Sequence, residues 1–294
     1  MKLYNNPEKK ERECGTCHKK KPYIEFKKRY NGLGKVRSIC KKCAIQAESD
    51  RLQMYNWVHK IEAIRFITKN QNNCQICGEI GIDTLPMLDF HNLYPELSSQ
   101  EAKEKGFWRS VRYKPWNYIK KELINQKVTI ICRNCHAKIN ATFFNNYLNI
   151  IQCNDIPEKI TPRLIKEKYI RKELKAFIRK KIILFEAWDG KCCNCGFGIT
   201  LNNIENLPAL ETHHLQPLNK SFNNFHKLCF LTSDIEKLKK ILINDNCICL
   251  CSNCQIIEQS TFFNKNKEGI FREYVKIFDS CNVENQRQNG RGGN

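Results

Sequence analysis

The chain has 294 residues, with 50 lysines and arginines against 30 acidic residues and a formal net charge of +20 at pH 7. This length allows two or three small domains, and the charge favours a polyanionic partner such as nucleic acid. No apolar run is long enough for a membrane span, and the opening MKLYNNPEKKERECG does not resemble a signal peptide. We therefore expect an intracellular protein of a reducing compartment (cytoplasm or organelle), neither secreted nor bound to membranes.

The 18 cysteines point to metal binding. Twelve of them form six Cys-x-x-Cys pairs, a spacing that lets two thiolates bind one tetrahedral zinc ion. Joining consecutive pairs predicts three structural four-cysteine zinc sites: Cys14, Cys17, Cys40 and Cys43; Cys74, Cys77, Cys132 and Cys135; Cys192, Cys195, Cys251 and Cys254. Three such sites would lower the net charge to about +14, which is still strongly basic. The alternative, a disulfide-bonded secreted protein, is disfavoured by the spacing and the missing signal peptide.

The first module, residues 1–48, is predicted to be a zinc ribbon. Between its two cysteine pairs, a glycine-containing turn separates two short strand-like segments. His18 directly follows Cys17 and is a candidate substitute ligand, although a surface position is favoured. The basic residues of this module that we expect to contact nucleic acid are Lys19, Lys27, Lys28 and Arg29.

Residues 49–155 and 161–281 are two copies of one unit, called repeat 1 and repeat 2 here. The offset between them is 118 at the opening cysteine pair and 119 at the closing pair, and TFFN at 142–145 recurs at 261–264. Each copy predicts a helix (51–69 and 163–186), a short strand with a histidine, a variable insertion, a second short strand and a helix opened by the second cysteine pair. The tail, 282–294, is rich in Gly and Arg and is expected to be disordered.

Two segments of the repeats are candidate nucleic-acid contacts. In GFWRSVRYKPWNYIKK, residues 106–121, aromatic and basic side chains alternate, which suits base stacking and phosphate binding. An aromatic cluster that covers the fold is the equal alternative. In the second segment, helix 163–186, one side is basic, and a solvated amphipathic helix is again the equal alternative. The candidate residues are Arg109, Arg112, Lys114, Trp116, Arg171, Lys175 and Arg179.

The first strands of the repeats share a frame. They read LDFHNLYP at 88–95 and LETHHLQP at 210–217, so that Asn92 in repeat 1 stands where repeat 2 has His214. Imidazole titrates near neutrality, which suits a base that activates water. Because adjacent residues of a strand point to opposite faces, His213 and His214 should reach one point only where the strand bends.

The order Cys-x-x-Cys, HHLQP and DNCICLCSNC resembles the HNH endonucleases, the His-Me finger or ββα-metal family. The resemblance implies that His214 is the general base and that His213 binds a catalytic Mg²⁺ or Mn²⁺ ion. It implies that Asn246 holds the loop and orients the base. Gln255 stands where the family has a final histidine, the second protein ligand.

Repeat 1 departs from the family pattern differently. It has Asn92 at the base position and Lys127 at the asparagine position, but keeps His91 and His136 at the ligand positions. By this resemblance repeat 1 carries a remnant metal site and does not cut. The N-terminal module resembles the zinc modules of phage and mobile-element HNH nucleases.

These observations predict an α+β protein made of a zinc ribbon and two ββα units. The expected function is that of a Mg²⁺-dependent DNA endonuclease of the homing type, which nicks through repeat 2 and grips DNA through the ribbon and repeat 1. RNA is the alternative polyanion. A non-catalytic, zinc-dependent nucleic-acid-binding protein built from decayed units is the alternative function, favoured by Asn92, Lys127 and Gln255.

Overall fold

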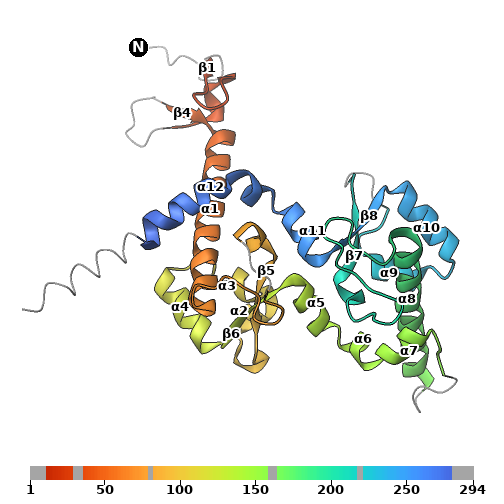
Figure 1. The fold of residues 1–294 in the computed structure, drawn as a ribbon. Helices are drawn as coiled ribbons and strands as arrows, with labels where there is room; N and C mark the ends of the chain where they lie inside the picture. The colour runs from red at the N-terminus through yellow and green to blue at the C-terminus, as the bar shows by residue number, and fades with distance from the viewer. Residues whose placement is uncertain (1–10, 29–35, 79–81, 158–163, 217–220, 280–294) are drawn as a thin grey trace, which may run out of the picture. The chain divides into compact units, whose positions relative to one another are not determined.

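The computed structural model describes residues 11–28, 36–78, 82–157, 164–216 and 221–279 (Figure 1). These residues form helices and small antiparallel sheets of two strands each, so the expected α+β class is confirmed. The chain divides into two compact units. One contains residues up to 60, 112–115 and 268 onward, and the other contains residues 61–111 and 116–267. None of the described helices combines the length and the apolar character that a bilayer span requires.

The N-terminal module consists of two hairpins around its cysteines. Strand β1 (Glu11–Glu13) pairs with β2 (Lys20–Pro22), and β3 (Phe26–Lys28) pairs with β4 (Val36–Cys40). A short 3-10 helix, η2 (Tyr23–Glu25), connects the hairpins. Among the described residues of this module, the buried core consists of Cys14, Phe26 and Cys40, against which Cys17, Tyr23 and Cys43 pack. A core this small does not hold two hairpins by apolar burial alone. The predicted NGLG turn lies outside the described residues.

Helix α1 (Lys41–Thr68) begins earlier than the sequence predicts. The expected helix started at residue 51, but Cys43 already lies in the first turn of α1. Cys40 is the last residue of β4 and Cys43 lies in the first turn of the helix, so the helix starts directly after Cys40. The expected boundary between ribbon and repeat 1, at residue 48, therefore lies inside one continuous helix.

Both repeats have a long first helix, a 3-10 turn, a strand, a helical insertion, a second strand and a helix, in that order, but their insertions and last helices differ. The remaining elements of repeat 1 are η3 (Ile82–Met87), β5 (Leu88–Asn92), η4 (Pro95–Leu97), α2 (Gln100–Lys105), α3 (Phe107–Val111), α4 (Trp116–Asn125), β6 (Val128–Cys132), α5 (Arg133–Asn140), α6 (Thr142–Asn146) and α7 (Leu148–Cys153). Those of repeat 2 are α8 (Leu164–Trp188), η5 (Leu207–Ala209), β7 (Leu210–His214), α9 (Phe225–Leu231), α10 (Ile235–Asn244), β8 (Cys247–Cys251), α11 (Ser252–Gln259), α12 (Thr261–Tyr274) and a final π-helical turn, Val275–Asp279.

The register of the two hairpins is identical. Leu88 faces Cys132 across β5 and β6, and Leu210 faces Cys251 across β7 and β8. At the other end, Asn92 faces Val128 and His214 faces Cys247. The helices opened by the closing cysteine pairs, α5 and α11, follow directly. The strand–strand–helix order predicted for each repeat is therefore present in both.

The variable insertions share one element. The insertion of repeat 2 forms two helices, because Asp234 accepts a hydrogen bond from the Lys237 N–H and caps a second helix, α10. Helices α4 and α10 match at the offset of 119, since IKKELIN at 119–125 corresponds to LKKILIN at 238–244.

A reciprocal pair of asparagines joins the repeats within the second compact unit. The Asn134 N–H donates to Asn253 Oδ1 at 2.9 Å, and the Asn253 N–H donates to Asn134 Oδ1 at 3.0 Å. Both residues are buried and both lie in the first turn of an equivalent helix. Helix α11 packs on η3 of repeat 1, and α5 packs on η5 of repeat 2. Exchanged contacts of this kind are the signature of a twofold-related interface.

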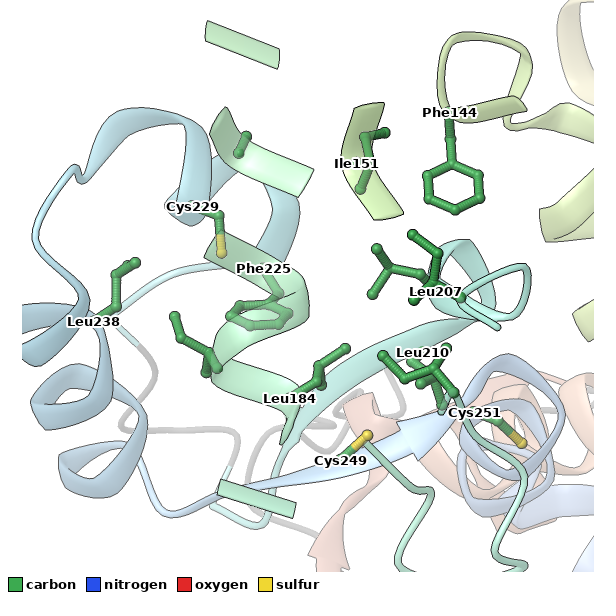
Figure 2. Close-up of a cluster of buried hydrophobic side chains, with 14 of the residues drawn as sticks. Phe144, Ile151, Leu184, Leu207, Leu210, Phe225, Cys229, Leu238, Cys249 and Cys251 are labelled. Carbon is green, nitrogen blue, oxygen red and sulfur yellow. The ribbon is translucent and has the colours of Figure 1, made fainter. Parts of the chain in front are cut away.

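The last helices of repeat 1 complete the core of repeat 2. Phe144 and Ile151 are buried among Leu184, Leu207 and Phe225 (Figure 2). Lys181, a buried lysine of α8, donates to the carbonyl oxygens of Ile151 at 2.6 Å and Gln152 at 2.8 Å and so satisfies the end of α7. Burial lowers the pKa of Lys181.

In the first compact unit, the last helix of repeat 2 packs on the first helix of repeat 1. There α12 packs on α1 closely enough that a side-chain carbon on Gly269 would lie 3.7 Å from Met54. His59 of α1 also meets the ring of Phe278 edge to face, with the ring centroids 5.8 Å apart. Each repeat therefore sends its C-terminal helices onto the first helix of the other, as in a domain-swapped dimer.

Either Asn134→Ala or Asn253→Ala should lower the free energy of unfolding by about 1–3 kcal/mol, since each change leaves a buried N–H without its acceptor. Urea denaturation of the zinc-loaded chain measures this. The matched control is Asn125→Ala, which changes an exposed asparagine and should cost less than about 0.5 kcal/mol. Because the two bonds form one reciprocal pair, the double variant should lose less than the sum of the singles. Additive losses would contradict the reciprocal interface.

Candidate functional site

Three clusters of four cysteines have the geometry of metal sites. In each predicted set, the four sulfur atoms lie within 4.8 Å of one another. The Cys77 and Cys132 sulfurs are 3.8 Å apart and those of Cys195 and Cys251 are 3.7 Å apart. A tetrahedral ion with Zn–S bonds of about 2.3 Å gives a sulfur–sulfur edge of about 3.8 Å. The predicted pairing is confirmed, and four thiolates at these distances fit zinc.

Backbone N–H groups prepare the first cysteine of each cluster to ionise. Cys14 Sγ accepts from the Cys40 N–H at 3.3 Å, and Cys74 Sγ accepts from the Cys132 N–H at 3.2 Å. Hydrogen bonds from the N–H groups of Cys40 and then Cys17 lower the pKa of Cys14 to about 5. For Cys74, burial raises the pKa, but the N–H groups of Cys77 and Cys132 outweigh it and the net shift is downward.

The third cysteine of both repeat clusters also caps a helix. Cys132 Sγ accepts from the Cys135 N–H at the start of α5, and Cys251 Sγ accepts from the Cys254 N–H at the start of α11. Thiolate charge is favourable at a helix N-terminus. A metal in each cluster would therefore fix hairpin and helix as one piece.

The other cysteines differ in environment from the cluster cysteines. Cys229 and Cys249 are buried in the core of repeat 2, where burial raises the pKa of the Cys229 thiol to about 12. They behave as small buried apolar groups. Cys193 is exposed and belongs to none of the three clusters.

Repeat 1 brings its two ligand-position histidines together. The rings of His91, on β5, and His136, on α5, have centroids 5.2 Å apart. His136 Nδ1 lies 3.1 Å from Asp89 Oδ2, and Arg133 lies 3.4 Å from the same oxygen. Burial, and then the neighbouring His136, lower the pKa of His91, which favours the neutral ring that a metal needs. Asp89 was not singled out in the sequence, although it stands two residues before His91 on the same strand face.

In repeat 2 the corresponding positions are those of His213, Gln255 and Glu211, and their contacts differ. No hydrogen bond joins His213 to Gln255 among the described residues, and both are half-buried. Glu211, the counterpart of Asp89, accepts from Lys180 Nζ at 2.8 Å. The Lys180 side chain is only 2% exposed, so this carboxylate already has a cation partner. Repeat 2 therefore lacks the histidine–carboxylate pair seen between His136 and Asp89.

His214 lies on the opposite strand face from His213 and meets a different set of groups. Its Nε2 is 3.3 Å from Asp245 Oδ2, and its ring packs on Phe222 with centroids 4.6 Å apart. Nε2 is buried and is not aligned for a hydrogen bond, so the contact is an ion pair when the ring is protonated. The His214 side chain is 12% exposed.

Asp245 is held in place by Ser221. The Ser221 N–H and hydroxyl both donate to Asp245 Oδ2, at 2.7 and 2.8 Å. Burial raises the pKa of Asp245, but these bonds and His214 outweigh it and keep the carboxylate ionised. Sequence reasoning missed Asp245. Its position directly before Asn246 was the only available signal.

Repeat 1 replaces both members of this pair with amides. Asn92 stands at the position of His214 and donates to the Ser98 hydroxyl. Gln126 stands at the position of Asp245 and donates to Glu122 at 2.6 Å. The side-chain oxygens of Asn92 and Gln126 are buried and have no partner. Repeat 1 therefore has two amides where repeat 2 has a histidine and a carboxylate.

The asparagine position of the family is a left-handed turn residue in both repeats. Asn246 has φ +49° and Lys127 has φ +45°. The Asn246 carbonyl accepts from the Leu215 N–H at 3.1 Å, which ties the second strand to the end of the histidine strand. Asparagine tolerates this conformation better than most residues with a side chain. Lys127 makes the same backbone contact in repeat 1, where its carbonyl accepts from the Leu93 N–H at 3.5 Å.

Some of the residues predicted to contact nucleic acid are exposed, and others are hydrogen-bonded within the protein. Exposed side chains are those of Lys19, Arg109, Lys114 and Lys175. Arg171 instead binds Glu167 and the Pro157 carbonyl, and Arg179 donates to the Cys229 carbonyl at 2.8 Å. Arg29 and the side chains of Lys27 and Lys28 lie outside the described residues.

Much of the aromatic insertion of repeat 1 supports the fold. Trp108 stacks on Phe90 of β5 with ring centroids 4.6 Å apart. Trp116 meets Phe66 edge to face at 6.2 Å. Arg112 lies over its neighbour Tyr113, 4.7 Å from the ring centroid. The alternative of an aromatic cluster covering the fold therefore accounts for both tryptophans.

Comparison with known proteins adds no relative: the chain matches no family model, no curated protein and no solved structure at a significant level. The internal comparison of repeat 1 with repeat 2 is consequently the most direct guide to its chemistry.

The purified chain should carry three zinc ions, one in each cluster. Elemental analysis measures this, with Cys74→Ser and Cys192→Ser each expected to lose one ion. Because zinc binds thiolates, protons compete with it, and zinc should be released as the pH falls. The control is Cys193→Ser, an exposed cysteine outside the clusters, which should retain all three. Zinc-free protein with oxidised cysteines would restore the disulfide alternative.

Asn246→Ala should lower the free energy of unfolding by about 1 kcal/mol, because alanine is strained at positive φ. Asn246→Gly should remain within about 0.5 kcal/mol of the unchanged protein, since glycine adopts this conformation freely. Chemical denaturation of the two variants measures the difference. An equal loss in both variants would show that the amide side chain, rather than the backbone conformation, is what the turn requires.

Proposed function

We propose that this chain binds DNA and that repeat 2 hydrolyses one phosphodiester strand, as an HNH-type endonuclease supported by three structural zinc ions. The observation that carries the proposal is the His214–Asp245 pair at the end of β7. It is accompanied by the left-handed Asn246 and by a helix that starts at a cysteine cluster, the arrangement that the resemblance implies.

The role of His214 is to accept a proton from the attacking water. Asp245 Oδ2 lies 3.3 Å from Nε2, which leaves Nδ1 as the nitrogen that can take the proton from water. Ser221 keeps the carboxylate ionised, and Phe222 fixes the ring plane. The chain thus orients this base before substrate binds.

The donor set for a catalytic ion is uneven between the repeats. A divalent ion would stabilise the leaving oxygen of a phosphodiester. His213 and Gln255 fit Mg²⁺ poorly, since this ion prefers carboxylate oxygens and water and Glu211 is already paired with Lys180. His91 and His136 of repeat 1 offer imidazole nitrogens, which transition ions prefer, although the three four-cysteine clusters are the metal-binding groups that the described residues form.

The second candidate is a nucleic-acid-binding protein that does not cut. Its specific support is that the histidine cluster is in repeat 1 and the histidine–aspartate pair is in repeat 2, so that neither repeat has both. A formal charge of +20 serves binding in either case. RNA is an alternative ligand of this candidate.

Conversion of supercoiled plasmid to nicked circles in Mg²⁺ and in Mn²⁺ tests the first candidate. The wild type and Asn92→Ala should nick, whereas His214→Ala should lose at least about 100-fold in rate, the contribution of a general base. Asn92→Ala is the matched control, because it alters the same strand position in the other repeat. Zinc content and gel-shift affinity measured on the same preparations verify folding and DNA binding.

Two results would reject cutting. The first is DNA binding with no nicks from any variant, which leaves the binding protein as the function. The second is equal nicking by wild type and His214→Ala, which would assign the activity to another site or to a contaminant.

A further inference from the structure

Each repeat exposes the same two apolar side chains at one turn. In repeat 1 they are Leu93, 57% exposed, and Ile124, 59% exposed. In repeat 2 they are Leu215, 50% exposed, and Ile243, 75% exposed. We call each set an apolar pair. Single exposed apolar residues are common, but the same two at equivalent places in both repeats require an explanation.

The backbone holds each apolar pair together through the left-handed residue. In repeat 1 the Leu93 N–H donates to the Lys127 carbonyl at 3.5 Å, and the Lys127 N–H donates to the Ile124 carbonyl at 3.1 Å. In repeat 2 the Leu215 N–H donates to Asn246 at 3.1 Å, and the Asn246 N–H donates to Ile243 at 3.0 Å. The leucine and isoleucine of each pair are thus parts of one rigid turn.

Positive charge accompanies both pairs. Lys121 and Lys240 are exposed and stand one helical turn before the two isoleucines, on the same helix face. Neither lysine forms an ion pair within the described part of the chain. In repeat 1 the ammonium group of Lys127 also lies 4.7 Å from the ring centroid of Tyr94. An apolar pair beside unpaired lysines fits DNA, in which stacked bases lie between two rows of phosphates.

The reciprocal Asn134–Asn253 contact indicates an approximate twofold relation between the repeats, and equivalent turns of such repeats are expected to be related by the same axis. A DNA duplex has twofold axes of its own, perpendicular to its length, because its strands are antiparallel. Apolar side chains that enter the minor groove and lie against base steps are a known device of DNA-bending proteins. A second copy of this chain or an acidic protein would not explain the pairing of each tip with lysines as directly.

We infer that the two apolar pairs, Leu93 with Ile124 and Leu215 with Ile243, enter the grooves of one DNA duplex at two places related by the twofold axis between the repeats. This rests on the proposed DNA binding but not on cutting. These groove contacts require a double-stranded substrate. They also require both repeats to contribute equally to DNA binding.

Fluorescence anisotropy with a labelled duplex of about 30 base pairs, roughly three helical turns, tests the inference. Leu93→Ser and Leu215→Ser should each weaken duplex binding by about 5–10-fold, and the double variant by about the product. Affinity for a single strand of the same length should change less than about twofold, because it has no grooves. Leu201→Ser is the matched control, since Leu201 is 79% exposed and lies outside both pairs.

The other outcomes overturn the inference in distinguishable ways. If wild type binds the duplex and both variants bind equally well, the apolar pairs do not touch DNA, although the proposed DNA binding stands. If only one variant binds more weakly, or single-strand affinity falls equally, the symmetric grip on a duplex is wrong. If the double variant abolishes self-association in ultracentrifugation and leaves duplex affinity unchanged, the pairs join copies of this chain. If wild type binds no duplex, the proposed function fails as well.

Discussion

The attachment of each short hairpin to the following helix through four cysteines is the constraint on which the structure depends. A two-stranded sheet is marginal by itself in water, and the sheets of this chain have strands of only three to five residues. In each repeat the opening cysteine pair precedes the first strand, and the closing pair lies where the second strand becomes a helix. A metal held there would fix the two strands and the helix as one piece. The distance between the strand histidines and the helix residues His136 or Gln255 would then follow from that piece.

The two repeats have diverged in a correlated way around this common frame. Where repeat 2 has a histidine and a carboxylate, repeat 1 has Asn92 and Gln126. His91 has its counterpart in His213, but His136 is replaced by Gln255, and the carboxylate at the position of Asp89 is paired with Lys180. An isolated buried charge is costly, so loss of the histidine in repeat 1 would have left an unpaired carboxylate at position 126. The amide there removes that cost. The pairwise exchange indicates that the two positions act together in each repeat.

The sequence predicted what depends on spacing within a segment. Cysteine pairs two residues apart predicted the three clusters, and alternating apolar residues predicted the strands with their histidines. It did not predict Asp245, Ser221 or the Lys180–Glu211 pair, because these contacts join residues 24 to 31 positions apart through the insertion and the long helix. The reciprocal asparagines were also missed. An asparagine inside a Cys-x-x-Cys turn has no signature that distinguishes a buried interface from a solvent-facing turn.

The exchange of helices between the repeats limits how this chain could have reached its present form. Phe144 and Ile151 of repeat 1 complete the core of repeat 2, and α12 of repeat 2 packs on α1. A single repeat would therefore expose the face of its first helix that the other repeat now covers. Such a unit could bury that face by pairing with a copy of itself through the same two asparagines. Fusion of two copies in one chain frees each from the requirement to be identical. One copy can then exchange a histidine and a carboxylate for Asn92 and Gln126, and the other can carry Gln255, while both keep the shared core.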